Sequence, residues 1–516
     1  MNTSSTTAEK IWDLRVHAQI APERIAISCG DILYTYGKLE TLSNQMASLF
    51  RSFGLARGDH IALLMGNRPE MLAIVWGAYR AGLYITPMAT TLTLNELTYM
   101  VKDCDAKLVL VDANLSDQSI ALAEQLESEQ LNFGSIGGEL PCCHNVALLL
   151  TTFSGLPILD ESPGALMMYT SGTTGYPKGV IRPLPDPTLK ATPSFATDLI
   201  ALFGIGGDDV RYLSTQPLYH AAALRFALAV TAGGGYVNIM PRFNAELALD
   251  LLQSEKITHS QWVPVMFQRL INLPANLREA FHAPHHRCAI HGAAPCSVTL
   301  KEVMIDWWGP IFLEYYSGSE GVGLSLINSY EAKLHPGSVG KVVKGVLHVV
   351  EGINATTELP PGEVGMLFFS GMAPFQYYKE PDKTAARTHR NGWQTLGDLG
   401  YVDAKGYVYL SDRLDDMIIS GGVNVYPQEI EKFIQEIPGV FECAVVGVSD
   451  TEFGERPIAF IVPESANSPA SLLERIRKHC EKNLGKIKRP DRFELIARLP
   501  RTPTGKLLRR QLRSLI

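Results

Sequence analysis

The segment 170–180 concentrates the residue types that hold a polyphosphate. It reads Thr-Ser-Gly-Thr-Thr-Gly-Tyr-Pro-Lys-Gly-Val and follows the apolar run 165–168. Glycine allows positive φ and close backbone approach, so successive N–H groups can converge on one anion. Hydroxyl groups add donors, and the lysine adds a mobile positive charge. The predicted phosphate-binding residues are Thr170, Ser171, Gly172, Thr173, Thr174, Gly175 and Lys178.

A Walker-type loop and a plain linker are the alternatives for this segment. The Walker pattern, counted from Gly172, needs a glycine at position 177, where the chain has Pro177. It also needs Ser or Thr after the lysine, and Gly179 stands there. Clusters of Ser, Thr and Gly are typical of surface loops, but such a density of donors after an apolar run favours a phosphate loop.

Four further segments combine glycine with polar or charged residues. They are His-Gly-Ala-Ala-Pro at 291–295, Tyr-Tyr-Ser-Gly-Ser-Glu-Gly at 315–321, Trp-Gln-Thr-Leu-Gly-Asp at 393–398 and Pro-Arg-Thr-Pro-Thr-Gly-Lys at 500–506. With 170–180, they resemble, in order, the motifs of the adenylate-forming superfamily: acyl-CoA synthetases, nonribosomal-peptide adenylation domains and firefly-type luciferases. The resemblance covers essentially the whole chain. It implies an ATP-dependent, AMP-forming ligase with ATP and Mg²⁺ as cofactors.

The resemblance gives the segment 315–321 a role at the phosphates. Tyr316 would lie against the adenine, and Ser319 would reach the α-phosphate. Glu320 would hold Mg²⁺, which prefers carboxylate and phosphate oxygens. Ser317 replaces a glycine of the family's motif, so the backbone there is expected to differ.

Two other segments are implied to hold the nucleoside. Gly292, Ala293 and Ala294 would cradle the adenine edge. Asp398 would accept hydrogen bonds from both ribose hydroxyls, as a two-oxygen acceptor can, and Arg413 would add a contact to the ribose. A turn acid and a hinge salt bridge are the alternatives for these last two residues. The chain departs from the family's motifs at His291 and Leu396.

The C-terminal part is implied to complete catalysis. Lys506 would bridge the acid's carboxylate and the α-phosphate as a point charge at developing negative charge. Asp415 corresponds to the family's hinge, about which a small domain swings between two half-reactions. The glycine-rich loop 421–427 would then enter the site. The expected catalytic residues are Lys506, Glu320 and Ser319.

The segments 218–223 and 263–267 correspond to the family's acyl pocket. Members that activate amino acids place an aspartate in the first segment, whereas this chain has a histidine followed by three alanines. That difference argues against an α-amino acid, and the small side chains leave room for a bulky or cyclic acid. Methionine in the second segment adapts to irregular shapes. Ordinary core packing is the alternative for each residue. The expected pocket residues are His220, Ala221, Ala222, Val263, Met266 and Phe267.

The acceptor of the acyl group is less constrained. CoA is the commonest acceptor in the family, and we expect CoA here; transfer to an amine or amino acid, as in coronafacate ligase, is the alternative. Thr91 stands where several CoA ligases carry a basic residue, whereas 484–490 keeps positive charge near the expected CoA entrance. A non-catalytic binding protein would be expected to lose Lys506, Glu320 or Asp398, and all three are present. No feature of the sequence indicates luciferase-like oxygen chemistry.

Composition limits the class of protein to which the chain can belong. The chain has 516 residues, 46% hydrophobic and 19% charged, which predicts a packed protein of at least two domains. Its net charge of −7 gives no footprint for nucleic acid. No apolar run reaches the roughly 18 residues of a membrane span. Eight scattered cysteines and the lack of a signal-like N-terminus predict a cytoplasmic protein. The oligomeric state is left open.

Alternating helical and strand patterns predict an α/β fold. We expect a large N-terminal domain, 1–412, of layered α/β sheets with a β-barrel-like subdomain from about residue 360, and a small mobile α+β domain, 413–516. The hinge is predicted at the polar stretch 411–416. The predicted helices are 37–53, 68–81, 244–254, 427–436 and 470–483. The predicted strands are 61–65, 108–111, 166–169, 236–240, 364–370, 444–448 and 458–462.

One cluster of potential metal ligands needs a separate interpretation. Four histidines and two cysteines lie between residues 282 and 296, but their spacing matches no common zinc pattern. The stretch 287–292 instead predicts a strand entering a glycine turn.

Overall fold

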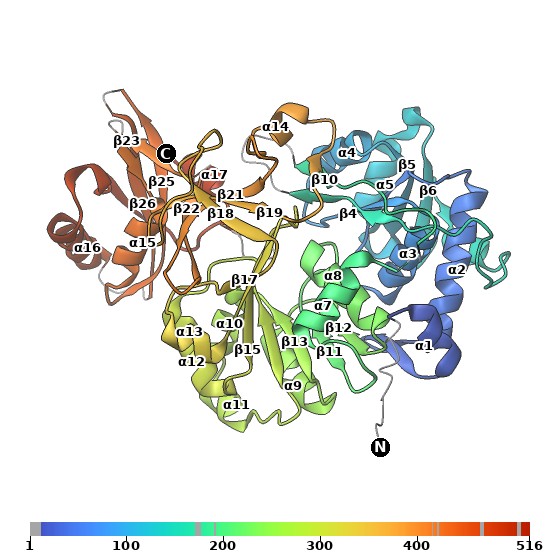
Figure 1. The fold of residues 1–516 in the computed structure, drawn as a ribbon. Helices are drawn as coiled ribbons and strands as arrows, with labels where there is room; N and C mark the ends of the chain where they lie inside the picture. The colour runs from blue at the N-terminus through green and yellow to red at the C-terminus, as the bar shows by residue number, and fades with distance from the viewer. Residues whose placement is uncertain are drawn as a thin grey trace, which may run out of the picture.

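The computed structural model describes residues 12–170, 177–189, 192–414, 416–420, 423–451, 453–464, 469–502 and 507–516. Two large sheets with their helices, two small antiparallel sheets and a C-terminal sheet make up this part of the chain. In Figure 1 the C-terminal sheet lies at the left and the six-stranded sheet at the right, with the small sheets between them.

The six-stranded sheet is parallel throughout. Its order is β7 (His144–Asn145), β6 (Asn132–Ile136), β5 (Ala106–Asp112), β3 (His60–Leu64), β4 (Tyr84–Met88) and β8 (Ala165–Leu166). Strands β3 and β4 are buried along their whole length, which explains their continuous apolar runs. The nearby helices are α1 (Leu14–Ile20), α2 (Tyr36–Ser52), α3 (Pro69–Arg80), α4 (Leu94–Asp103), η1 (Ala113–Leu115), α5 (Ser116–Gln125), η2 (Glu127–Glu129) and α6 (Val146–Leu150).

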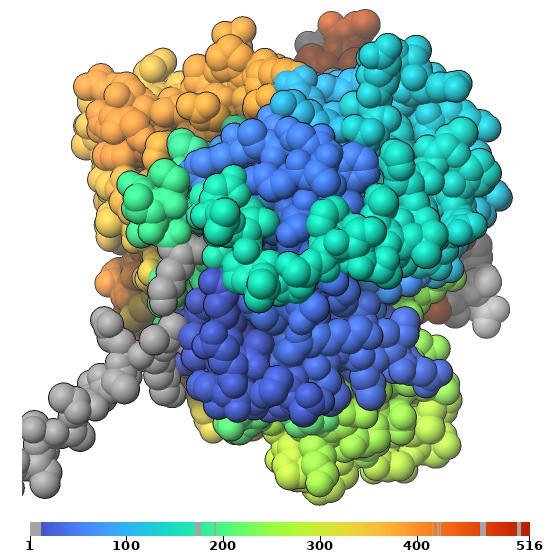
Figure 2. All heavy atoms as spheres, turned by 90° about the vertical axis from the view of Figure 1, so that its right-hand side faces the viewer, coloured from blue at the N-terminus to red at the C-terminus, as the bar shows by residue number. Residues whose placement is uncertain are grey.

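Helices α2 and α3 pack against each other at close range. A side chain at Gly77 would place its Cβ 2.8 Å from the carbonyl oxygen of Ser43, so the crossing requires glycine. Helix α4 begins with a capping box, in which Thr93 and Glu96 exchange side-chain and backbone hydrogen bonds. Figure 2 shows that this N-terminal layer, blue to cyan, covers much of one face of the molecule.

The nine-stranded sheet is mixed. Its order is β17 (Lys341–Lys344), β16 (Leu324–Asn328), β15 (Phe312–Tyr316), β14 (Cys288–His291), β13 (His259–Trp262), β11 (Arg211–Ser214), β12 (Tyr236–Ile239), β1 (Ile25–Cys29) and β2 (Ile32–Thr35). The strands from β15 to β1 in this order are parallel, and the outer pairs are antiparallel. Its helices are α7 (Ser194–Phe203), α8 (Ala221–Ala232), α9 (Ala245–Ser254), α10 (Pro264–Ile271), α11 (Ala275–Ala280), α12 (Val298–Trp308) and α13 (Ser329–Leu334).

Two antiparallel sheets contain the strands between residues 360 and 413, where the sequence predicts a β-barrel-like part, and also earlier strands. One has the order β18 (Val346–Val350), β19 (Gly365–Ser370), β21 (Gln394–Val402) and β22 (Val408–Arg413). The other has the order β20 (Gln376–Tyr377), β10 (Lys178–Ile181) and β9 (Met168–Thr170), and α14 (Pro381–Ala385) follows β20.

The predicted strand 166–169 is divided between two sheets. Met167 still donates its backbone N–H to Ile85 of β4, at 2.8 Å, and the next residues pair with β10 instead. The chain thus leaves the parallel sheet and enters a hairpin directly before the predicted phosphate loop. A continuous apolar run cannot reveal this change of partner.

The C-terminal sheet has the order β24 (Val423–Val425), β23 (Ile418–Ser420), β26 (Gly454–Pro463) and β25 (Val440–Asp450), with β27 (Arg492–Leu495) parallel to β26. Its helices are α15 (Pro427–Gln435), α16 (Pro469–Asn483), η3 (Lys486–Lys488) and α17 (Arg509–Arg513). A separate apolar core, including Ile430, Ile434 and Ile476, packs beneath it. Mixed helices and a sheet with their own core match the predicted small α+β domain.

The predicted hinge begins inside a strand, because β22 continues to Arg413. The buried carboxylate of Asp412 accepts a hydrogen bond from the backbone N–H of Gln428, at 3.0 Å, and so joins β22 to the first turn of α15. Asp415 lies outside the described residues, and the division at 412/413 stays a prediction. Within the described residues, none of the helices is both long and apolar enough to span a membrane.

Candidate active site

The predicted phosphate loop joins the two strands of a hairpin. Thr170 ends β9 and pairs directly with Lys178, which begins β10. The Nζ atom of Lys178 lies 5.3 Å from the centre of the Tyr377 ring, on the next strand. Of the predicted phosphate-binding residues between them, Ser171, Gly172, Thr173, Thr174 and Gly175 lie outside the described part of the chain. The two described ends of the loop are therefore side by side.

Glu320 and Tyr377 come together beside this hairpin. The Tyr377 hydroxyl donates a hydrogen bond to Oε1 of Glu320, at 3.1 Å. Burial, and then the charge of Glu320, raise the pKa of Tyr377 well above its usual range, so this hydroxyl keeps its proton. One group thus combines a cation, a hydrogen-bond donor and an acid, which are Lys178, Tyr377 and Glu320.

A second group forms around Asp398. The Tyr316 hydroxyl donates to Oδ2 of Asp398, at 2.7 Å, and Nε of Arg413 lies 3.6 Å from Oδ1. Asp398 and Arg413 are cross-strand partners on β21 and β22. Burial, and then the charge of Asp398, raise the pKa of Tyr316 well above its usual range. The predicted nucleoside-binding residues Tyr316, Asp398 and Arg413 therefore stand in contact.

The turn that carries Ser319 and Glu320 is held by two arginines. Arg182 donates to the carbonyl oxygens of Glu320 and Gly321, both at 2.8 Å, and Arg225 donates to that of Ser319, at 3.3 Å. Neither arginine, nor Tyr377, is among the residues predicted from sequence. The available signal for Arg225 is a single charge in the otherwise apolar helix α8.

The predicted adenine turn follows β14 directly. Ala293 has φ of +67°, and a Cβ at Gly292 would lie 2.7 Å from the carbonyl oxygen of Tyr315. Gly292 is therefore needed for the turn to lie against the end of β15. This contact places Gly292, Ala293 and Ala294 beside the strand that ends at Tyr316.

The predicted acyl residues split between two helix starts. Val263, Met266 and Phe267 are buried at the start of α10, where the Sδ atom of Met266 accepts a hydrogen bond from Thr215, at 3.2 Å. His220 immediately precedes α8, followed by half-buried Ala221 and Ala222. Burial lowers the pKa of His220 to about 4, so its ring is neutral at pH 7.

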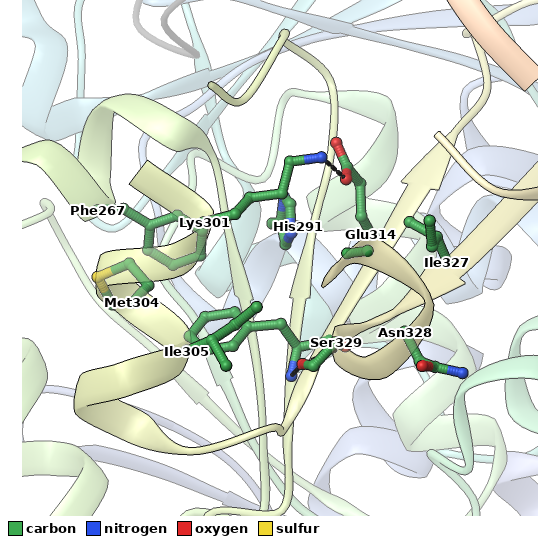
Figure 3. Close-up of a pocket in the computed structure, with 11 residues that line it drawn as sticks. Phe267, His291, Lys301, Met304, Ile305, Glu314, Ile327, Asn328 and Ser329 are labelled. Carbon is green, nitrogen blue, oxygen red and sulfur yellow. Dashed lines mark hydrogen bonds and ion pairs between the residues drawn. The ribbon is translucent and has the colours of Figure 1, made fainter. Parts of the chain in front are cut away.

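A small cavity lies behind Phe267 (Figure 3). Its volume is about 10 Å³, close to the minimum that holds one water. The buried pair Lys301 and Glu314 faces it, with Nζ 2.5 Å from Oε2. His291 also lines it, and burial, and then the charge of Lys301, lower the pKa of His291 to about 3. Phe267, one of the expected acyl residues, therefore also lines this polar cavity.

The histidines and cysteines between 282 and 296 do not form a metal centre. His282 and His285 are exposed, whereas His286 is buried with Nε2 2.7 Å from the hydroxyl of Ser260. Cys288 to His291 form strand β14, as predicted. Across the described ranges there is no group of three or more His, Cys, Asp or Glu that could hold a metal ion.

Comparisons with known proteins identify the family. The family model "AMP-binding enzyme" matches residues 14–379, and "AMP-binding enzyme C-terminal domain" matches residues 429–506. Over 512 residues the chain is 31% identical to a long-chain-fatty-acid–CoA ligase, FadD13, of Mycobacterium tuberculosis, covering 97% of each chain. Over 502 residues it is 32% identical to a 2-succinylbenzoate–CoA ligase of Oceanobacillus iheyensis, covering 97% of this chain and 98% of the relative.

A solved structure shows the same fold. The o-succinylbenzoate CoA synthetase of Bacillus subtilis, in complex with its acyl-adenylate intermediate, superimposes with a TM-score of 0.80 at 26% identity and 98% coverage of both chains. The two family models together cover most of the chain, including the strand and the turn that carry Lys178 and Glu320, and Asp398 lies between the two matched ranges. The chain belongs to the AMP-binding enzyme family and is an ATP-dependent, AMP-forming ligase.

Proposed function

We propose that this enzyme converts ATP and a bulky or cyclic carboxylic acid to an acyl-adenylate and pyrophosphate, and then transfers the acyl group to the thiol of CoA. The proposal rests on two groups of side chains, which lie at the two ends of the turn that follows β15. Tyr316 with Asp398 and Arg413 suits a nucleoside, and Glu320 with Tyr377 and Lys178 suits its phosphates.

In the first half-reaction, a carboxylate oxygen of the acid attacks the α-phosphorus, and the bond to the pyrophosphate oxygen breaks. Negative charge builds on the leaving pyrophosphate, where Thr170, Lys178 and the loop between them would stabilise it. Lys506 would neutralise the incoming carboxylate and the α-phosphate. In the second half-reaction, the acceptor's sulfur attacks the acyl carbon and AMP leaves.

Mg²⁺ fits the residues present. It is commonly held by one or two carboxylates together with substrate phosphates, and not by an all-protein cage. Glu320 offers one carboxylate beside the hairpin whose second strand begins at Lys178, and Tyr377 fixes one of the carboxylate oxygens. When bound, the ion would neutralise phosphate charge and orient the phosphates.

The acyl side supports an acid without an α-ammonium group. His220 is neutral at pH 7 and offers no carboxylate, and Val263, Met266 and Phe267 present an apolar wall. The two relatives are named for a fatty acid and for 2-succinylbenzoate. Both names describe carboxylic acids without an amino group, and the second acid contains a ring.

CoA is favoured as acceptor because both relatives are named as CoA ligases. The basic segment 484–490 gives less support than its charge suggests. Lys488 pairs with Glu429, at 2.7 Å, and Arg489 donates to two carbonyl oxygens at the end of α16. Transfer to an amine or amino acid therefore stays the alternative.

The test supplies ATP and Mg²⁺ with a panel of aliphatic, aromatic and polycyclic acids, and measures pyrophosphate release. Each active acid is then offered CoA or a set of amino acids, and the products are identified by mass. We expect acid-dependent pyrophosphate and a thioester of the preferred acid. An amide without a thioester would replace the CoA proposal by the alternative, and no pyrophosphate with any acid would contradict adenylation.

A further inference from the structure

We propose that Arg182 and Arg225 are positioning residues for adenylation. They fix the backbone of the turn 319–321 so that Ser319 and Glu320 meet the nucleotide in one geometry. This inference rests on the proposed function, and it concerns residues that act through the turn without touching the substrates.

The contacts form a bracket on three consecutive carbonyl groups. Nη2 of Arg182 donates to the carbonyl oxygens of Glu320 and Gly321, and Nη2 of Arg225 donates to that of Ser319. The second bond of Arg182 depends on a glycine, because Gly321 has φ of +60° and a Cβ there would lie 3.3 Å from Nη2. Two guanidinium groups thus set the orientation of three successive peptide groups.

The orientation of these carbonyls also orients their N–H groups. In a trans peptide group the C=O and N–H bonds point in opposite directions. With the carbonyls of residues 319 to 321 turned toward the arginines, the N–H groups of Glu320, Gly321 and Val322 turn away from them. Gly321 donates its N–H back to Gly318, at 3.0 Å, which closes the turn. The N–H groups of Glu320 and Val322 remain on the side away from the arginines, where backbone N–H groups favour an anion.

The positive charges of Arg182 and Arg225 also favour an anion beside the turn. Both side chains are half-buried, and burial, and then the nearby charge of Arg225, lower the pKa of Arg182. Two like charges this close oppose each other, so the arrangement is unfavourable unless something compensates for it. Glu320 compensates in part, through its attraction for Arg225. An anionic nucleotide beside the turn would compensate further.

The bracket joins the three elements that must cooperate in adenylation. Arg182 directly follows β10, the strand that begins at Lys178. Arg225 lies one helical turn after Ala221 and Ala222, the predicted acyl residues at the start of α8. The turn itself follows β15 and Tyr316. Both arginines therefore reach the same turn, one from the phosphate hairpin and one from the acyl helix.

The test compares Arg182→Met and Arg225→Met with Arg51→Met. Arg51 is a matched control, because it too donates to two backbone carbonyls, those of Leu55 and Ala81, both at 2.9 Å, but far from the turn in sequence and outside the candidate site. For each protein we would measure MgATP binding by calorimetry, the half-saturating Mg²⁺ concentration, pyrophosphate exchange, and hydrogen exchange of the segment 317–323.

Loss of either bracket residue should lower kcat/KM for adenylation about 10- to 100-fold, as for residues that support a ligand from behind. Weaker MgATP binding, a higher Mg²⁺ requirement and faster hydrogen exchange at 317–323 should accompany it, with the melting temperature close to that of Arg51→Met. Wild-type values for Mg²⁺ requirement and rate in both Met variants, or an equal loss in Arg51→Met, would overturn the proposal.

Lysine variants decide the matter if a Met variant does not fold. Arg182→Lys keeps a positive charge but cannot reproduce the planar guanidinium, so we expect a smaller loss of the same kind; unchanged Mg²⁺ dependence would overturn the bracket. Calorimetry and hydrogen exchange need no acid. A wild-type enzyme that binds MgATP but adenylates no acid would therefore contradict the proposed function. Calorimetry and hydrogen exchange would still test whether Arg182 and Arg225 fix the turn.

Discussion

The predicted nucleotide side of the candidate site is held by single polar contacts, whereas the predicted acyl side is a packed apolar wall. On the nucleotide side, one tyrosine hydroxyl fixes Glu320 and another fixes Asp398. On the acyl side, Phe267 is buried among His291, Trp262 and Phe312, with ring centres 5.4 to 6.0 Å apart. A polar contact fixes the geometry of one side chain, whereas the shape of a packed wall depends on many residues together.

This difference predicts two kinds of mutational effect. Removing one group from the nucleotide side should lower the rate for every acid equally, because ATP is common to all reactions. Removing one group from the acyl side should change the preference among acids and also lower the free energy of unfolding, because the wall is part of the core.

The largest effect is expected for Lys506→Ala. The side chain would neutralise charge only in the adenylation step, so pyrophosphate exchange should fall by at least about 100- to 1,000-fold. Acyl transfer from supplied acyl-adenylate should continue at a rate close to that of the wild type. Both half-reactions are measured on the same preparation, and an equal loss in both would contradict the assignment of Lys506.

Asp398→Ala should come next. The carboxylate would accept two ribose hydroxyls, and a hydrogen bond to a charged group contributes about 1.5–3 kcal/mol, so even with the lower value for both bonds kcat/KM for ATP should fall on the order of 100-fold. Asp398→Asn keeps one oxygen acceptor and should lose less. The ratio of rates among acids should not change in either variant. A loss that depends on the acid would remove Asp398 from the nucleotide side.

Phe267→Ala should have a smaller effect on rate and a different pattern. The preference should shift toward larger acids by about 10-fold, as for small changes in an apolar pocket. The free energy of unfolding should fall by about 3–5 kcal/mol. Rates across the acid panel and urea unfolding measure the two effects, with Phe267→Leu, which removes less volume and keeps an apolar side chain, as the control. A uniform loss of rate would mean that Phe267 is only core packing.

The same contrast explains what the sequence can predict. On the nucleotide side, a phosphate loop and acidic turns need particular residue types at close spacing, so Lys178, Glu320 and Asp398 stand out. Arg182, Arg225 and Tyr377 do not, because they meet the turn only through tertiary contacts. The expected roles of all these residues stay predictions, and those of Lys506 and Asp415 concern positions outside the described residues.

Secondary structure follows the same logic. The helices predicted at 37–53, 68–81 and 244–254 are confirmed as α2, α3 and α9. The strand predicted at 166–169 is wrong as a single element, because β8 and β9 belong to different sheets. Local periodicity identifies an element, but the partner of a strand depends on residues far away in the sequence.

The smallest effect on activity, and the sharpest on acid stability, is expected from three buried histidines of the nine-stranded sheet and its loops. His259, His286 and His291 are buried on or beside β13 and β14. Burial lowers the pKa of His259 to about 4, and those of His286 and His291 to about 3. In the unfolded chain each returns to a pKa near 6.5. The unfolded chain therefore binds more protons between about pH 6.5 and 3, so stability is full above pH 6.5 and is lost as the pH falls.

His286→Gln isolates one of these contributions. The glutamine can keep a hydrogen bond to Ser260, the partner of His286 Nε2, without titrating. Between pH 7 and pH 5 the wild type should lose about 2 kcal/mol more of its unfolding free energy than the variant. Exposed His285, one residue away, gives the control His285→Gln, which should follow the wild type. Urea unfolding at both pH values measures the difference. If His286→Gln loses as much unfolding free energy between pH 7 and pH 5 as the wild type, the acid sensitivity must come from other groups.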